Sequence, residues 1–515
     1  MLARSNDEYA KELFTPTIDD AETSITCRYP PSSWSSRNLS DAFTSKATIK
    51  LTGLLHQCCR RAALLLCPSF LLHVDTLKTD RPHPTSYLDG LRGLAAFAVF
   101  LCHMSYSVFN VTHAYGADDV DEYRHFLRLP IIRLFYSGPP MVAIFFVISG
   151  FALSYKPLKQ MRASAHNGLL ESMSSATFRR PIRLFLPCIA STLIVLACVE
   201  LGLYERTRPF ETSTTLLRAT HEWHPHRLPT WRAQLADYAE QMFSFVHVWS
   251  WGVFNGSTHY DVHLWTIPVE FRASLALFLT QLACARLRPR VRVAALSCLI
   301  GWAVRWDRWE VALFWSGMLL AEWNLVRQQQ HAKPPPPGLV TTSKPPAEAG
   351  RADTVARRAC WAAVFLLACH LASYPDRRAA TTPGFRHLAA WVPACLSEPY
   401  RFWQCVGATL LVAAADNAAF LRPPLNAGVV QYLGRISYAL YLVHGPVVHL
   451  FGYAVMPLAW SLTGADTALR FRLGFACSAC LIVPAVVWAA DVFWRAVDVP
   501  TVRFARWLER KCIVR

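Results

Sequence analysis

Long apolar runs recur at about ten places along the chain, and they constrain the fold more than any other feature. The runs lie near residues 93–112, 139–156, 181–203, 262–284, 291–306, 309–326, 357–374, 402–421, 430–456 and 471–494. A helix needs about 20 apolar residues to cross a bilayer, and several runs are shorter, so the count is approximate. In lipid, a helix satisfies its backbone polar groups within its own segment. The runs predict an all-α, polytopic integral membrane protein with about ten transmembrane helices.

Basic residues gather between these runs. Lys and Arg number 52 against 35 Asp and Glu, which gives a formal net charge of +17. If the N-terminus is cytosolic, the strongly basic segments 156–180, 286–292, 327–358 and 503–515 all fall on the cytosolic side, as the positive-inside rule requires. The charge therefore indicates topology and not a nucleic-acid surface. The predicted partner is the lipid bilayer, with no nucleic acid and no obligate protein partner.

Composition divides the chain into three parts. Residues 1–80 are largely polar and do not begin with a secretory signal, and they predict a poorly ordered tail. Residues 81–500 form one transmembrane domain, within which the Pro-rich segment 328–356 predicts a flexible cytosolic linker. Residues 501–515 are a basic C-terminal tail. The sixteen cysteines show neither a zinc spacing nor a disulfide framework.

Arg92 and His103 stand at the two ends of one apolar run, YLDGLRGLAAFAVFLCH. Eleven residues make about three helical turns, so the two side chains share a face and lie roughly 16 Å apart along the axis. A neutral histidine in this setting is either a general base for a hydroxyl or a polar core residue bonded to a neighbouring helix. An arginine near the cytosolic end suits a phosphate-bearing cofactor.

Three further charged residues lie in or beside apolar runs. Arg180 and Arg183 share a helical face, where they either contact the phosphates of a cofactor or anchor the helix by the positive-inside rule. Glu270 lies within a span, and an unpaired carboxylate is unfavourable there. We expect Glu270 to pair with Arg272, with His263 or with an arginine of another helix. It then either orients the reacting groups or fixes helix packing.

Candidate contacts to a substrate are polar or aromatic side chains within the runs: His263, Trp265, Ser149, Tyr438, Tyr441 and His444. The last three are spaced three apart and share a helical face, which either closes a site or bonds helix to helix. Trp265 either stacks on a substrate ring or packs in the core. Ser149 belongs to a pair of small residues, where close helix packing is the simpler role.

No metal site is predicted. His221, His224 and His226 in HEWHPH have a loose ligand spacing, but they belong to no HExxH motif and have no cysteine pair beside them. The chemistry expected of Arg92 and His103 does not require a metal ion.

Six segments in order resemble the membrane-bound acyltransferase type 3 family. They are YLDGLRGLAAFAVFLCH at 87–103, IFFVISGFALS at 144–154, FRRPIRLFLP at 178–187, HLWTIPVEF at 263–271, LGRISYALYLVHGPVV at 433–448 and VFWRAVDVP at 492–500. The resemblance implies transfer of an acyl group, often acetyl from acetyl-CoA, to a hydroxyl. It implies His103 as the essential base and Arg92 as a contact to the donor, and it gives Arg180 and Arg183 a role at the coenzyme A phosphates.

On this resemblance we expect an acetyl-CoA-dependent O-acetyltransferase that uses acetyl-CoA or another short acyl-CoA. The expected acceptor is a small secondary metabolite such as a terpenoid or polyketide alcohol, and the alternative is a glycan or glycolipid. A proton-coupled transporter is the alternative from another class, because it also uses buried ionisable residues. An intracellular membrane such as the endoplasmic reticulum is the expected location.

Overall fold

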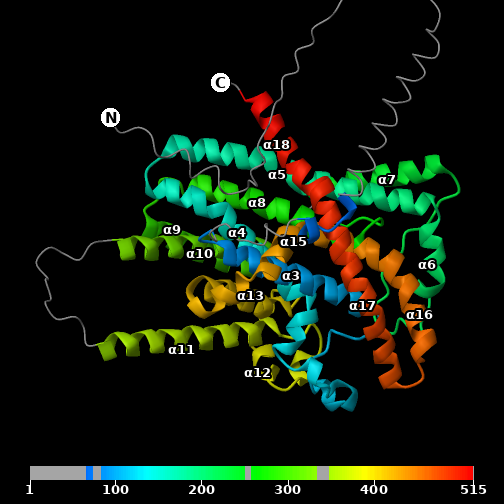
Figure 1. The fold of residues 1–515 in the computed structure, drawn as a ribbon. Helices are drawn as coiled ribbons and strands as arrows, with labels where there is room; N and C mark the ends of the chain where they lie inside the picture. The colour runs from blue at the N-terminus through cyan, green and yellow to red at the C-terminus, as the bar shows by residue number, and fades with distance from the viewer. Residues whose placement is uncertain (1–64, 73–82, 250–256, 333–346, 514–515) are drawn as a thin grey trace, which may run out of the picture. The chain divides into compact units, whose positions relative to one another are not determined.

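The computed structural model describes residues 65–72, 83–249, 257–332 and 347–513. Within these ranges the protein is helical and contains no β-strand beyond an isolated bridge between Thr258 and Asp261. The long helices, labelled in Figure 1, are α3 (Ser86–Ser105), α4 (Gly138–Arg162), α5 (His166–Glu200), α8 (Thr266–Ala283), α9 (Pro289–Arg305), α10 (Trp309–Ala332), α11 (Ala347–Ala372), α13 (Arg401–Asn417), α15 (Gly428–Val447) and α17 (Ala468–Phe493). The predicted all-α fold is confirmed.

A helix occupies each of the ten predicted runs, but ten spans are not confirmed. Among the described residues, seven helices are long and apolar enough to cross a membrane, and the bent pair of α13 with residues 419–425 raises the number to eight. The 17-residue helix α9 and the helix α10 do not meet these criteria. The protein is a multi-pass membrane protein, and its described residues contain seven or eight candidate spans.

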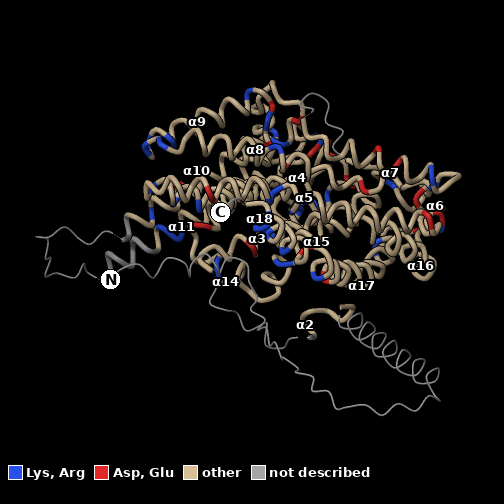
Figure 2. The backbone as a smooth tube through the Cα atoms, turned by 90° about the horizontal axis from the view of Figure 1, so that it is seen from above, with Lys and Arg blue, Asp and Glu red and all other residues tan. Residues whose placement is uncertain are grey.

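Shorter helices connect and flank the long ones. They are α2 (Ser69–Leu72), α6 (Leu203–Glu211), α7 (Trp231–Val246), α12 (Arg386–Ala389), α14 (Arg422–Leu425), α16 (Tyr453–Thr463) and α18 (Val499–Cys512). The π-helical turn η8 (Val448–Gly452) links α15 to α16. Basic residues mark the ends of several helices, among them α9 and α11 (Figure 2).

Three segments differ in extent from the sequence-based prediction. The predicted linker 328–356 is narrower, because α10 continues to Ala332 and α11 begins at Ala347, while residues 333–346 lie outside the described ranges. The basic tail forms helix α18, which packs against α5 through an ion pair between Arg179 and Glu509. Most of the predicted N-terminal tail lies outside the described residues, but Ser69 bonds through its main-chain nitrogen to the Asp491 carboxylate at 2.9 Å.

Helices α3 and α15 lie side by side and run parallel, because Gly93 meets Gly434 near their starts and His103 meets His444 near their ends. A Cβ placed on Gly93 would lie 2.4 Å from the Gly434 nitrogen, and one on Gly434 would lie 2.5 Å from the Asp89 carbonyl oxygen. Glycine at both positions therefore permits a backbone approach that any side chain would block. This contact sets the register that brings the two histidines together.

Gly93→Ala is expected to destabilise the protein by about 1–3 kcal/mol, because the added methyl group meets backbone atoms that cannot move aside. Thermal unfolding in detergent measures the change. Gly301→Ala on α9 is the matched control, because a Cβ there meets nothing within 4 Å and alanine favours the helix. Equal melting temperatures for the two variants would contradict the close α3–α15 packing.

Candidate active site

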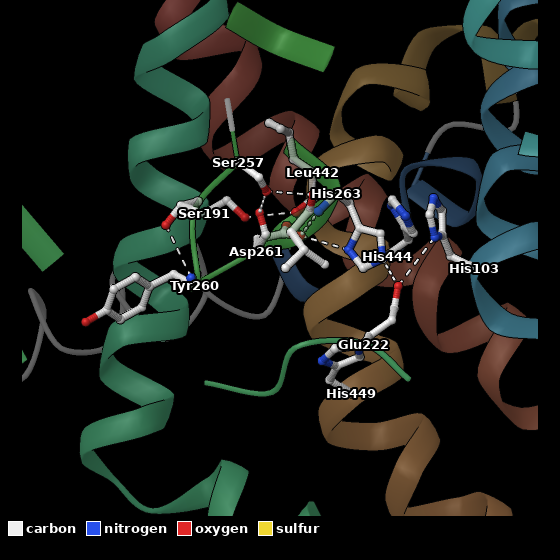
Figure 3. A network of polar contacts seen from close by, with 12 residues as sticks. His103, Ser191, Glu222, Ser257, Tyr260, Asp261, His263, Leu442, His444 and His449 are labelled. Carbon is white, nitrogen blue, oxygen red and sulfur yellow. Dashed lines mark hydrogen bonds and ion pairs between the residues drawn. The ribbon is translucent and has the colours of Figure 1, made fainter. Parts of the chain in front are cut away.

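Three histidines from different parts of the chain meet at one end of the α3–α15 pair (Figure 3). His103 lies in the last turn of α3, His444 lies in the last turn of α15, and His263 lies in the 3₁₀ turn η5 (Val262–Trp265) that precedes α8. The ring centroid of His103 is 4.2 Å from that of His263 and 5.2 Å from that of His444. The sequence nominated all three residues, and the structure brings them together.

Glu222 connects His103 and His263, and it adds His449 to the cluster. It lies in the loop between α6 and α7, and its side chain is buried beside the histidines. Its Oε1 is 2.5 Å from His263 Nε2 and 3.5 Å from His103 Nδ1, and its Oε2 is 2.6 Å from His449 Nε2. The Tyr106 hydroxyl, just beyond α3, donates to the same carboxylate. One carboxylate thus holds three imidazole rings and one phenol.

The Glu222 carboxyl is ionised near neutral pH. Burial alone would raise its pKa, but the charge of His263 and the contacts with His103, His263 and His449 lower that pKa well below the usual 4.5. Glu222 is therefore an acceptor only, and each nitrogen that hydrogen-bonds to it carries a proton.

His263 lies between two carboxylates. Its Nε2 faces Glu222, and its Nδ1 is 2.8 Å from Asp261 Oδ1. Both nitrogens donate, so the ring is an imidazolium whose charge is balanced by its two partners. The Tyr441 hydroxyl donates to the His263 main-chain carbonyl, and a Cβ on Gly445 would lie 2.4 Å from His263 Nδ1. Helix α15 therefore fixes the ring position closely.

His103 keeps one nitrogen available. Its side chain is 22% exposed, although its Nδ1 is buried and faces Glu222. Its Nε2 remains accessible and has no hydrogen bond within the described residues. When Nδ1 carries the proton toward Glu222, Nε2 holds a free lone pair and acts as a base. This is the arrangement that a general base requires.

The same three rings form a candidate metal site, since one nitrogen of each lies within 4.8 Å of the others. A metal ion would have to replace a proton that His263 donates to Glu222 or Asp261. His444 offers Nε2, which is buried without a partner, while its Nδ1 contacts the Leu440 carbonyl at 3.1 Å. The hydrogen bonds of His263 fit a proton-holding cluster better than a set of metal ligands.

A second polar group forms around Glu270. Arg180 Nη2 donates to Glu270 Oε1 at 2.6 Å, and Ser149 Oγ donates to the same oxygen at 3.0 Å. Arg180 also contacts Ser274 Oγ at 3.3 Å. Glu270 therefore pairs with an arginine of another helix, one of the three partners expected from the sequence. Within the described ranges, no hydrogen bond or ion pair joins Glu270 to the histidine cluster, so its catalytic role stays a prediction.

Arg92 lies on α3, about three helical turns before His103. It donates to Ser437 Oγ and to the Gly434 carbonyl, each at 3.0 Å, and it pairs with Asp89 at 3.0 Å. Its side chain remains 34% exposed. These contacts connect the first turns of α3 to α15. Arg183 lies within electrostatic reach of Arg92, and also of Arg180, Arg179 and Asp498.

The remaining predicted residues are divided between packing and the site. Tyr441 contacts His263, but Tyr438 donates to the Leu184 carbonyl of α5 at 2.6 Å, outside the cluster. Trp265 is partly buried and packs beside Trp309, with Arg401 5.5 Å from its ring centroid. Trp265 and Tyr438 therefore have packing contacts, and their substrate roles stay predictions.

Sequence reasoning missed Glu222, His449, Asp261 and Tyr106. The HEWHPH segment had been considered only for its histidines, and among the described residues these form no metal cluster. His224 instead contacts the Tyr204 carbonyl at 2.9 Å, and the carboxylate of the same segment is what reaches the site. His449 lies in the π-helical turn η8, a type of irregularity often found at functional sites.

A family model described as an acyltransferase domain matches residues 85–495, which include every group described above except α18 and the N-terminal contacts. The chain belongs to the type 3 acyltransferase family. Its relatives include the O-acetyltransferase PaAT-1 of Phomopsis amygdali, 31% identical over 87% of this chain and 89% of the relative. No solved structure matches it significantly.

Two further fungal relatives are similar over most of their length. Acyltransferase R4 of a Phoma species is 29% identical over 81% of this chain and 94% of the relative. Acyltransferase clz18 of Cochliobolus lunatus is 29% identical over 84% of this chain and 97% of the relative. The predicted family and the predicted enzyme class, an acyltransferase, are thereby confirmed.

Proposed function

We propose that this membrane acyltransferase transfers an acetyl or other short acyl group from acyl-CoA to the hydroxyl of a small molecule. The accessible Nε2 of His103, set opposite an Nδ1 that faces the Glu222 carboxylate, carries the proposal. That pairing orients the ring and stabilises the positive charge it gains when it accepts a proton.

In the proposed reaction, His103 Nε2 accepts the proton of the acceptor hydroxyl as its oxygen attacks the thioester carbonyl. Acetyl-CoA supplies that carbonyl and its thiol leaving group. His103 then returns the proton to the departing sulfur, so the proton count balances. Glu222 holds the imidazolium of His103 during the step, and Tyr106 and His449 keep the carboxylate in place by hydrogen bonds.

The donor end of the site is proposed at Arg92, Arg180 and Arg183. Arg92 lies three helical turns from His103 on the same helix, roughly 16 Å along the axis. That length is comparable with the reach of a pantetheine arm. Arginine recognises phosphate through paired donors, and Arg92 retains exposed surface for such contacts.

Arg180→Ala is expected to raise the KM for acetyl-CoA by about tenfold and to change the KM for the acceptor much less, since one charge-assisted phosphate contact is lost. Steady-state kinetics with each substrate varied in turn provide the measurement. Arg179→Ala is the matched control. Arg179 directly precedes Arg180, but its guanidinium pairs with Glu509 on α18. A larger rise in the acceptor KM than in the donor KM would refute donor binding at Arg180.

The proposed acceptor is a secondary-metabolite alcohol such as a terpenoid or polyketide. The name of the Phomopsis relative, an O-acetyltransferase, supports an oxygen acceptor. Trp265, which is partly buried, is the proposed stacking surface for a carbocyclic skeleton or a sugar. A glycan or glycolipid is the alternative acceptor, and an intracellular membrane such as the endoplasmic reticulum is the proposed location.

Labelled acetyl-CoA distinguishes these acceptors. Membranes that contain the protein are incubated with acetyl-CoA labelled in its acetyl group and with a panel of small alcohols, beside membranes that contain the His103→Ala variant. The expected product is a labelled small ester that only the wild type forms. Labelled glycolipid with no small ester would establish the alternative acceptor, and equal ester formation by a folded His103→Ala variant would refute the role of His103.

A further inference from the structure

A cavity lies away from the histidine cluster, near the start of α3. Its volume is about 540 Å³, within the range of about 300–1,000 Å³ that is typical of small-molecule sites. It lies where α3 begins and where α13 and the described part of α10 end, beside the middle of α11. We call it the arginine pocket, because its lining includes Arg327, Arg357, Arg358 and Arg422, with Trp361 and Asp416 beside them.

The carboxylate of Asp416 in this pocket already has hydrogen-bond and ion-pair partners within the protein. Asp416 accepts hydrogen bonds from the Tyr87 hydroxyl at 2.7 Å and from Asn324 Nδ2 at 2.6 Å, and it forms an ion pair with Arg327. Arg422 donates to the Asp416 main-chain carbonyl at 3.1 Å, and its guanidinium lies 5.7 Å from the centroid of the Tyr87 ring. One acidic group therefore neutralises one of the four arginines, and the pocket keeps an excess of positive charge.

Arg357 and Arg358 supply most of this excess. Both side chains are exposed, and within the described ranges neither forms a hydrogen bond or an ion pair. Both side chains line the same cavity, so an anion bound there would interact favourably with both guanidinium groups. Trp361, one turn along α11, adds an aromatic face to the same cavity.

The arginine pocket is distinct from the proposed donor site. Tyr87 and Arg92 are five residues apart on α3, so their side chains point about 140° apart around the helix. Tyr87 bonds to α13 at the pocket, whereas Arg92 bonds to α15 on the other side. Phosphates bound at Arg92 therefore lie on a different face of α3 from the pocket.

We propose that the arginine pocket binds a phosphate-bearing anion, with Arg357 and Arg358 as its principal contacts. Arginine forms paired, charge-assisted hydrogen bonds to phosphate oxygens, and Asp416 holds Arg327 and Arg422 as the fixed wall behind them. The phosphate belongs either to a soluble nucleotide, whose base stacks on Trp361, or to a lipid headgroup at the membrane surface.

Two binding arms separate these sources. Purified protein in detergent is titrated with ATP as the soluble probe, and protein in phosphatidylcholine nanodiscs is compared with and without phosphatidylinositol 4-phosphate. Saturating CoA is present throughout, so that the donor region is occupied. We expect the Arg357→Gln/Arg358→Gln variant to bind the probe at least about tenfold more weakly than the wild type. Trp361→Ala should weaken the binding of ATP but not of the lipid.

The control loses the same charge elsewhere. Arg290→Gln/Arg510→Gln removes two exposed arginines that do not line the pocket, and it should bind the probe as the wild type does. Weaker probe binding by the Arg357→Gln/Arg358→Gln variant alone, with either ATP or the lipid, supports the proposal. The probe that shows this loss identifies the source of the phosphate. Absence of binding in both arms, or equal loss in the control, would overturn it.

Discussion

Replacing His103 by glutamine is expected to lower kcat by about a thousandfold, which is within the usual contribution of a general base. Glutamine preserves much of the side-chain volume and its contact with Glu222, but it has no nitrogen lone pair that accepts a proton. The KM for acetyl-CoA should stay within about twofold, because the proposed donor contacts lie roughly 16 Å away at Arg92. Steady-state kinetics on purified protein measure both values.

His370→Gln is the matched control for this variant. His370 lies on α11, where its ring stacks on Phe385 outside the cluster, so its replacement should leave kcat unchanged. Thermal unfolding verifies that both variants fold. A folded His103→Gln variant with kcat near that of the wild type would show that another group accepts the proton.

Replacing Glu222 by glutamine is expected to lower kcat by about a hundredfold. The change removes the negative charge that the imidazolium of His263, His449 and the reacting His103 all face. A hydrogen bond to a charged group contributes about 1.5–3 kcal/mol, and each 1.4 kcal/mol corresponds to a factor of about ten in rate. Because Glu222 touches no reacting atom, it is a positioning residue. Its replacement should therefore change the pH dependence of kcat as well as the magnitude of kcat.

Stability provides a second readout for Glu222. Its pKa in the folded protein is lowered, so its contribution to stability is complete above the usual value of 4.5 and is lost as the pH falls below it, toward the folded-state pKa. The Glu222→Gln variant should therefore lose less of its free energy of unfolding than the wild type as the pH falls below 4.5. Glu240→Gln is the control, because Glu240 is exposed on α7 and lies outside the cluster. A pH profile of kcat that both variants share with the wild type would contradict the positioning role.

Local sequence patterns predicted the parts of the site that depend on one helix. The Arg92–His103 spacing gave their common face on α3, and the His444 motif placed that residue on the partner helix. Glu222 was missed because it is 119 residues from His103 along the chain and lies in a loop, so no helical periodicity relates the two. Its position depends on how the segment between α6 and α7 packs onto the helices, which local spacing does not specify.

Helix boundaries, like the site, were predicted only in part from local sequence. The apolar runs predicted where helices occur, but α3 ends at Ser105, short of residue 112, where its run ends. The predicted linker is shorter than its Pro-rich composition indicated, since α10 and α11 extend into it from both sides. Tertiary contacts and helix continuation, rather than hydrophobicity, decide these ends.

Coupled product formation by the detergent-solubilised protein tests the central claim most directly. Detergent removes the two compartments that a transporter requires, while an acyltransferase keeps its chemistry. The account predicts that ester and free CoA thiol appear in equal amounts from acetyl-CoA and an accepted alcohol, at a rate that depends on His103. Solubilised, folded protein that releases no thiol and forms no ester with acceptors that are converted in membranes would contradict it.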